Sequence, residues 1–483
     1  MKTNLLKNIG KLLSGSTLAQ LISILSAPIV THLFAPDVFG VLGLYISIAT
    51  VPIMLSSLRY HLAIPLAKDS TEAHSVYSLS VSLTFFVSAI CAYLVYAHGD
   101  AIASTLNSAS LAEYLWLLPL SVLVRGIHLA VQFYCTREQK FAAISFSSVI
   151  DSALGAAISI SIGLLYSASA AALISARVVA GFASLLSMST IAYKQNMQLL
   201  LPRIKPSQLI EIASRYKKFP LISSWASILN TLAFILPVMV IAYYFSAEHV
   251  GLYTLADRVI ILPLSMIGTA VAQVLYQRVC ELNHNQQSFN LTVSVILDKL
   301  ASISIFPMLC LTLIGAELFA LVFGAEWYQA GRYAQILSVY GLFRFIIAPL
   351  TNISAAIEKQ EIELVFNIVL CIGRVAAIVY GGIQGDIIIG LILMTGASVL
   401  AYTLLLVMIL SQSTTIMVDC LKIILKQLLA AAPLLIIIFI SRELYGYNTQ
   451  GLVLFACGLL FLANLYICNK EYLSQPQNND KPE

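Results

Sequence analysis

The sequence predicts an all-α polytopic membrane protein with about fourteen transmembrane helices. Apolar residues make up 59% of the 483 residues and charged residues only 10%, whereas soluble domains carry about 25% charged residues. The mean hydropathy is +0.89. Long apolar runs recur along the whole chain with short loops between them, and a hydrocarbon core of about 30 Å needs about 20 helical residues. These three observations place the chain in the membrane class.

Each expected helix is an apolar run of about 18 residues or more. The first follows Lys2, Lys7 and Lys11. It is longer than the apolar part of a signal peptide and further spans follow it, so we expect it to be retained. The expected spans are residues 12–34, 38–65, 76–97, 111–135, 143–166, 168–193, 219–245, 249–275, 291–324, 330–357, 361–383, 386–410, 420–441 and 451–468.

The loop cations predict the orientation of the chain. Among the cations in the loops and near the ends of the expected helices, only Arg332 and Arg442 lie on one side of the membrane, whereas the other Lys and Arg residues lie on the opposite side. Because cytoplasmic loops carry the excess of Lys and Arg, we expect both termini to be cytoplasmic.

An internal repeat predicts two lobes. The stretch FAPDVFG from Phe34 and the stretch FSAEHVG from Phe245 match at an offset of 211 residues. Each copy holds six expected helices, so both copies enter the membrane in the same direction, as in transporters built from parallel repeats. The residue pairs at this offset are Asp37 and Glu248, Gly40 and Gly251, and Pro52 and Pro263.

The repeat divides the chain into five expected parts. The linker between the lobes is basic and partly amphipathic, so we expect it along the anionic inner leaflet. The parts are an N-terminal six-helix lobe at 1–193, a basic cytoplasmic linker at 194–218, a C-terminal six-helix lobe at 219–410, an extra helix pair at 411–470 and a disordered cytoplasmic tail at 471–483.

Cations outnumber carboxylates inside the expected helices. A charged residue at the centre of a membrane helix costs about 2.5–3.5 kcal/mol on insertion scales, so such residues face water or partners rather than lipid. The embedded cations are Arg59, Arg125, Arg177, Arg258, Lys299, Arg344 and Arg374, and the acids are Asp151, Asp257, Asp298 and Glu317. This excess favours an anionic ligand, and phosphate or pyrophosphate suits the planar donor fork of Arg best.

Helical spacing places these charges on polar faces, because residues three or four apart share one side of a helix. The expected faces are Ser56 and Arg59; Ser121, Arg125, His128 and Gln132; Ser147, Asp151, Gly155 and Ser159; Tyr340, Arg344, Ala348 and Thr351; and Asn367, Cys371 and Arg374. Since the faces come from both repeats, we expect a water-filled cavity between the lobes. Its expected ligand-binding residues are Arg59, Arg125, Arg258, Arg344 and Arg374.

A structural reading of some of these charges stays open. Arg177 can pair with Asp151, and Asp257 with the adjacent Arg258. Arg59 is near the inner end of its helix, from where its side chain reaches the headgroups.

Three arginines near mid-span, Arg125, Arg344 and Arg374, have no spare carboxylate in this reading, and a ligand role is favoured for them. His128 is read first as a packing residue and second as a proton relay. The candidates for ion coupling or for pairing are Asp151, Asp257, His128 and Arg177.

The sequence shows no signature of an enzyme or a metal centre. The eight cysteines are scattered without a CxxC pair, and there is no histidine cluster, phosphate-binding glycine loop or nucleophile elbow. We expect no catalytic residue, no metal, no cofactor and no nucleic-acid partner.

The chain resembles the bacterial O-antigen (Wzx-type) polysaccharide-unit flippases of the multidrug/oligosaccharidyl-lipid/polysaccharide exporter superfamily. The resemblance extends to about residue 410. It is carried by LLSGSTLAQLISILSAPIVTHLFAPDVFGVLGLYISIATV, YCTREQKF, VGLYTLADRVIILPLSMIGTAVAQVLYQR and FGAEWYQAGRYAQILSVYGLFRFIIAPL.

This resemblance implies a flippase of the bacterial inner membrane. It would move an undecaprenyl-pyrophosphate-linked oligosaccharide to the periplasmic leaflet by alternating access, with proton or sodium coupling. Membrane lipids and other polysaccharide assembly proteins are the further partners that it implies.

The similar lipid II flippases have cavity arginines on their first, second and eighth helices. Arg59 and Arg258 match two of these places, whereas the first helix here offers only His32. A lipid-tail groove on the extra pair at 411–470 is implied as well, although many O-antigen flippases have twelve helices.

Two rival functions remain. A drug/cation antiporter of the same superfamily would need anionic or aromatic cavity faces, and here cations prevail. A membrane glycan polymerase would need a large outer loop, and the longest expected one is about 98–110.

Overall fold

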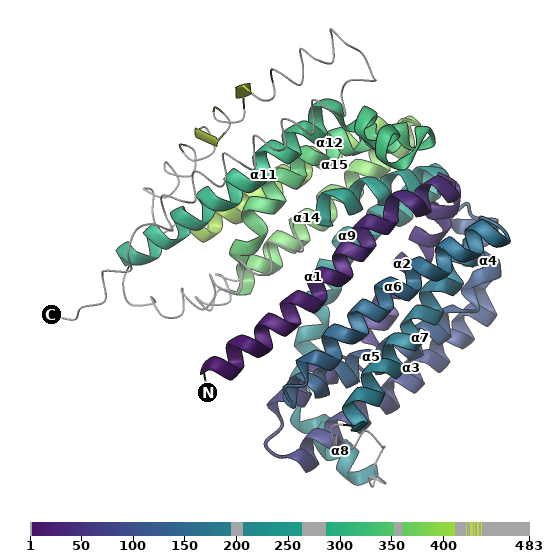
Figure 1. Cartoon of the computed structure of the whole chain (residues 1–483), viewed down its shortest axis with the longest axis vertical. Coiled ribbons are helices and arrows are strands. Elements are labelled where there is room, and N and C mark those ends of the chain that lie inside the picture. Colours follow the sequence, from purple (N-terminus) through teal and green to yellow (C-terminus); the bar gives the residue numbers. More distant parts are fainter. Residues whose placement is uncertain are drawn as a thin grey trace. The chain divides into compact units, whose positions relative to one another are not determined.

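The computed structural model describes residues 2–194, 206–262, 286–351 and 360–410 and a few positions between 422 and 436. All regular structure in these residues is helical (Figure 1). Among them, 11 helices are long and apolar enough to cross a membrane, which confirms the all-α polytopic fold class. They correspond to eleven of the expected spans, and the other three, 249–275, 420–441 and 451–468, lie partly or wholly outside the described residues.

The chain divides into two compact units, each described by itself. The first, here the N-terminal unit, comprises Met1–Leu255 and Asn367–Met394. The second, the C-terminal unit, comprises Ala256–Phe366 and Thr395–Glu483.

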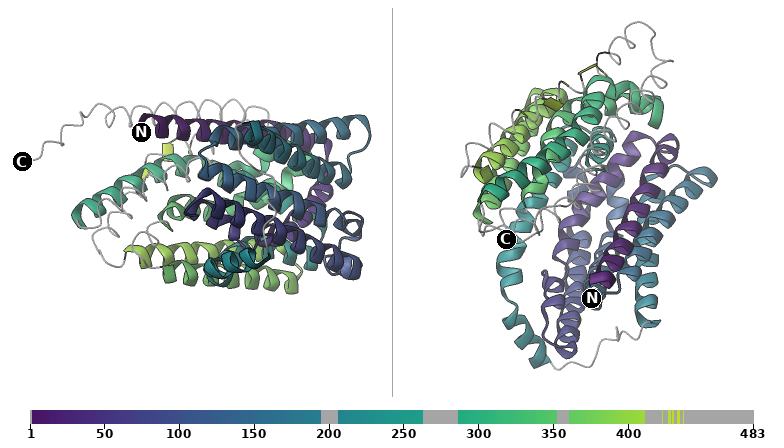
Figure 2. Two further views of the ribbon diagram at one scale, coloured as in Figure 1. Left: turned by 90° about the horizontal axis from the view of Figure 1, so that it is seen from below. Right: turned by 60° about the vertical axis from the view of Figure 1, so that its left-hand side comes forward.

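The N-terminal unit is a bundle of long helices, drawn from purple through blue to teal in Figure 2, apart from its segment Asn367–Met394, which is green. Within it α1 packs along α6, α6 on α7, α3 on α5, and α2 on α5 and α7. Its elements are α1 (Lys2–Leu33), α2 (Pro36–Leu55), η1 (Tyr60–Leu66), α3 (Ser70–Thr105), α4 (Ala109–Leu115), α5 (Leu118–Arg137), α6 (Phe141–Leu165), α7 (Ala170–Lys194), α8 (Pro206–Arg215), η2 (Phe219–Ser223) and α9 (Ser224–Tyr244). Residues 247–262, which begin in this unit, are also helical.

The second helix is shorter than predicted. It begins with Pro36 at its first position and Asp37 in its first turn, both favourable at a helix N-terminus. It ends at Leu55, because Leu58 and Arg59 have the left-handed φ angles of 48° and 65°. The expected single helix at 38–65 is therefore wrong beyond this point, and Arg59 precedes the separate short helix η1.

The segment 194–218, the expected linker, contributes the helix α8, which packs on α3 of the same unit. At the start of α3, Asp69 accepts a hydrogen bond from the backbone N–H of Glu72 (2.7 Å), and the Glu72 carboxylate accepts one from the backbone N–H of Lys68 (2.8 Å). The same carboxylate pairs with Arg215 at the end of α8 (2.6 Å) and accepts a hydrogen bond from the Tyr216 hydroxyl (3.1 Å). One buried carboxylate therefore caps α3 and holds α8 against it.

The C-terminal unit is built around a helix pair. Its helix α11 (Gln286–Phe323) packs along α12 (Tyr328–Ile347), with the fully buried Trp327 between them in the chain. Two further helices, α14 (Gln360–Gln384) and α15 (Ile387–Leu410), contribute residues to both units.

Candidate functional site

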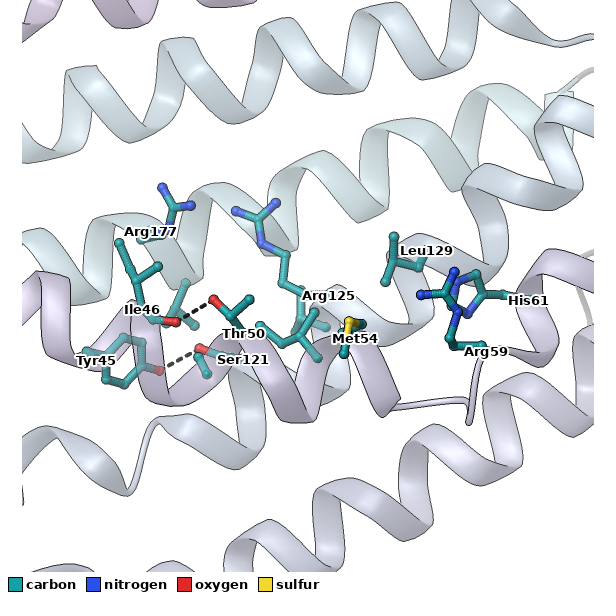
Figure 3. A pocket seen from close by; sticks show the side chains of 14 residues that line it. Tyr45, Ile46, Thr50, Met54, Arg59, His61, Ser121, Arg125, Leu129 and Arg177 are labelled. Atoms are coloured by element: carbon teal, nitrogen blue, oxygen red, sulfur yellow. Dashed lines mark hydrogen bonds between the residues drawn. The ribbon is translucent and has the colours of Figure 1, made fainter. Parts of the chain in front are cut away.

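A pocket of about 430 Å³ opens within the N-terminal unit (Figure 3). Three helices, α2, α5 and α7, supply its walls together with the start of η1 and Arg59, which precedes it. Apolar side chains form half of the lining, and the polar and charged ones are Tyr45, Thr50, Arg59, His61, Ser121, Arg125 and Arg177. A pocket with this volume and composition falls in the range of small-molecule sites.

Arg59 and His61 form one end of this pocket, next to each other in Figure 3. Their placement depends on the break after α2, because the left-handed backbone at Arg59 turns the chain out of the helix. The guanidinium of Arg59 donates a hydrogen bond to the Ser227 hydroxyl on α9. The predicted polar face of Ser56 and Arg59 is therefore wrong, although Arg59 does line a pocket.

His61 is a pocket residue that the sequence did not single out. It is only 6% exposed, its Nδ1 lies 2.5 Å from the Ser57 hydroxyl, and its ring packs against Phe133. Burial, together with the nearby Arg59, lowers the pKa of His61 to about 4. The ring is therefore neutral near pH 7, and Arg59 provides the positive charge at this end of the pocket.

Arg125 lines the middle of the pocket and forms an ion pair with Asp151 on α6. The two bonds run from Nη1 to Oδ2 (3.1 Å) and from Nη2 to Oδ1 (2.8 Å). The expectation that Arg125 has no carboxylate partner is therefore wrong, because spacing along α5 did not reveal that α6 brings Asp151 beside it. Figure 3 shows Arg177 of α7 extending in the same direction as Arg125.

The predicted polar face of α6 is mostly used for helix packing. Ser147 is fully buried, and its carbonyl accepts a hydrogen bond from the Ser184 hydroxyl of α7 (2.9 Å). Ser184 also lies 3.1 Å from Nε2 of His128. This bond favours the packing reading of His128 over a proton relay.

Arg374 occupies a helix contact away from the pocket lining. It is 1% exposed, donates to the backbone carbonyl of Ala233 on α9 (3.2 Å) and lies over the ring of Phe234 (5.1 Å). The polar face predicted for Arg374 also contains Cys371 and Asn367. The side chain of Asn367 accepts a hydrogen bond from Asn230 of α9 (2.9 Å). This face of α14 is thus packed on α9.

The remaining predicted site residues belong to the C-terminal unit. Arg258 is exposed and Arg344 is half-buried within it. Asp257 accepts a hydrogen bond from the buried hydroxyl of Tyr340. The convergence of all five arginines on one cavity stays a prediction. The part of the chain that the structure describes holds no cluster of three or more potential metal ligands.

Known proteins resemble this chain in sequence and in fold. Residues 29–332 match the family described as polysaccharide biosynthesis protein. An uncharacterized membrane protein in the cps region of Klebsiella pneumoniae is 25% identical over 347 residues, 71% of this chain and 69% of that protein. The lipopolysaccharide biosynthesis protein WzxC of Escherichia coli is 26% identical over 156 residues, 32% of each chain. The succinoglycan biosynthesis transport protein ExoT of Rhizobium meliloti is 21% identical over 394 residues, 79% of this chain and 75% of that protein.

Solved structures agree at the level of the fold. The lipid II flippase MurJ in an inward closed conformation matches with a TM-score of 0.77 and 12% identity, over 96% of this chain and 99% of that one. A multidrug resistance MATE transporter of the MOP superfamily in an inward-facing conformation matches with a TM-score of 0.63 and 15% identity, over 82% of this chain and 96% of that one. These findings agree with the expectation of a transporter rather than an enzyme. The chain belongs to the family of polysaccharide biosynthesis proteins, in the fold shared by MurJ and the MATE transporters, as its resemblance to the Wzx-type flippases predicted.

Proposed function

We propose that this protein flips an undecaprenyl-pyrophosphate-linked oligosaccharide, an O-antigen or other surface polysaccharide unit, from the inner to the outer leaflet of the bacterial inner membrane. Family membership supports a role in polysaccharide biosynthesis, and the named function of ExoT supports transport. The observation that carries the proposal is the pocket of the N-terminal unit, which is lined by Arg59, Arg125 and Arg177.

These arginines suit a phosphorylated ligand. A guanidinium offers a rigid fork of donors that matches phosphate oxygens, and it keeps its charge at any physiological pH. The apolar remainder of the lining lowers the local dielectric constant, which strengthens each such bond. Near pH 7 the neutral His61 adds no charge, so Arg59 is the cation that an incoming pyrophosphate meets at this end.

Alternating access completes the proposed mechanism. Fourteen spans, in two six-helix lobes with an additional C-terminal pair and with both termini cytoplasmic, provide the architecture, and Arg258 and Arg344 complete the cavity from the second lobe. The ligand must bind the two cavity states with different affinities, because equal binding would shift neither population. Coupling to a proton or to sodium supplies the direction.

A drug/cation antiporter is the second candidate, because the MATE transporter shares the fold. Three arginines in one pocket oppose a cationic ligand, so the flippase is preferred.

Reconstitution tests the proposal. The purified protein is placed in liposomes that carry a fluorescent polyprenyl-pyrophosphate-linked disaccharide, and a membrane-impermeant quencher reports the fraction of lipid in the outer leaflet. We expect this fraction to rise above that of protein-free vesicles, and to rise far less for the same lipid without its pyrophosphate. Equal transfer of both lipids would contradict the proposal.

A further inference from the structure

Arg125 lines the pocket, and two N–H groups of its guanidinium are already hydrogen-bonded to another side chain. Two parallel N–H···O bonds join it to Asp151, which is the geometry in which a guanidinium binds a carboxylate or a phosphate. Both side chains keep some exposure, 22% for Arg125 and 30% for Asp151. Asp151 therefore holds, inside the protein, the place that an anionic ligand would take at Arg125.

We infer that Asp151 is a built-in competitor for the ligand, so that a phosphate-bearing anion binds Arg125 when Asp151 has taken up a proton. This inference rests on the proposed function and adds a rule to it: for each anion that binds Arg125, Asp151 takes up one proton. The proton comes from water in the pocket and forms an O–H bond on the Asp151 carboxylate. It returns to water when the anion leaves.

Electrostatics requires the exchange. A charged Asp151 and a pyrophosphate at the same guanidinium would repel each other at short range in a low-dielectric surrounding. A protonated Asp151 removes this repulsion and offers an O–H donor to the ligand. In either state Arg125 keeps a negative partner, so its guanidinium is not left in the membrane without a counter-charge.

The other groups that can exchange a proton at this site are found among the neighbours of Asp151. On α5, His128 interacts electrostatically with Asp151. On α7, Arg177 lines the same pocket and keeps its charge. On α1, Ser23 lies 3.3 Å from Ser152, and residues 15–31 of that helix contain no titratable side chain. His128 is thus the one alternative proton carrier among these neighbours in the described residues.

Binding measured against pH tests the inference. The full-length protein in detergent is titrated calorimetrically with inorganic pyrophosphate and with geranyl pyrophosphate, from about pH 8 to about pH 5. We expect the affinity of the unmodified protein to rise as the pH falls, by up to about tenfold per pH unit for the uptake of one proton. Buffers of different ionisation enthalpy should reveal the uptake of one proton.

Substitutions separate Asp151 from the other groups. Asp151→Asn should bind as tightly at high pH as the unmodified protein does at low pH, and retain only the slope that comes from titration of the probe itself. Asp151→Glu should keep the dependence, which guards against a general effect of substitution at this position. Arg125→Gln should bind weakly at every pH.

Three outcomes would overturn the inference. An unchanged slope in Asp151→Asn, or a slope lost in His128→Gln instead, removes Asp151 as the carrier and leaves the proposed function standing. Full affinity in Arg125→Gln does the same. If neither the unmodified protein nor Asp151→Asn binds either probe at any pH, the anion site and the proposed function fail together.

Discussion

Gly40 of α2 and Gly251 of the helix at residues 247–262 lie backbone to backbone, in a contact that is reciprocal. A Cβ added to Gly40 would collide with the carbonyl oxygen of Ala247, and one added to Gly251 with the carbonyl oxygen of Pro36. The repeat offset of 211 residues relates both the two glycines and these two carbonyl-bearing residues. Each copy thus presents the same two positions to the other, as expected around a pseudo-twofold axis. This symmetry supports the proposed pair of repeats.

The first prediction follows from this close contact. Gly40→Ala should lower the free energy of unfolding by about 1–3 kcal/mol, because the new methyl group forces the two backbones apart. Gly396→Ala is the matched control, since Gly396 also lies in a helix but has open space around its Cα. This control should be neutral or slightly stabilising. Equal thermal unfolding of the two variants in detergent would argue against a tight contact at Gly40.

The second prediction concerns the charge at the end of the pocket. Arg59→Gln should reduce lipid transfer in the liposome assay by about tenfold or more, because a charge-assisted bond to phosphate is lost there. Arg59→Lys keeps the charge but not the planar fork, so we expect an intermediate rate. Lys218→Gln removes an exposed cation outside the pocket lining and should leave transfer unchanged. Normal transfer by Arg59→Gln would remove Arg59 from the site.

The spans were predictable from the sequence because lipid imposes one rule on every residue that crosses it, and hydropathy measures that rule directly. The break after Leu55 was not, because apolar residues recur from Leu58 to Leu66 around Arg59, so the run can be taken for one continuing helix with a polar face. Helical spacing placed Arg125 on a polar face correctly. It could not show which neighbouring helix that face meets, so the pairing with Asp151 and the pocket position of His61 emerged only in three dimensions.

The third prediction tests the contact between the linker helix and α3. Glu72→Gln should destabilise the protein by about 1–3 kcal/mol, because the buried carboxylate loses its charge opposite Arg215. Arg215→Gln should add little on top of it, since both substitutions remove the same ion pair. Glu211→Gln, on the exposed side of α8, should have no measurable effect. Fully additive effects of the Glu72 and Arg215 substitutions in a double-mutant cycle would show that the pair does not hold α8.

The fourth prediction is a pH dependence of stability that originates at His61, beyond the end of the α2 span. Its pKa is lowered to about 4 in the folded protein, whereas the unfolded chain has the ordinary value of about 6.5. The unfolded state therefore binds the proton more readily, and stability should fall as the pH drops from about 6.5 to about 4 by up to about 3 kcal/mol. His61→Gln should flatten this part of the curve of unfolding temperature against pH. His98→Gln, at an exposed position of α3, should leave the curve as it is. If His61→Gln still loses stability between about pH 6.5 and pH 4, the dependence belongs to another group.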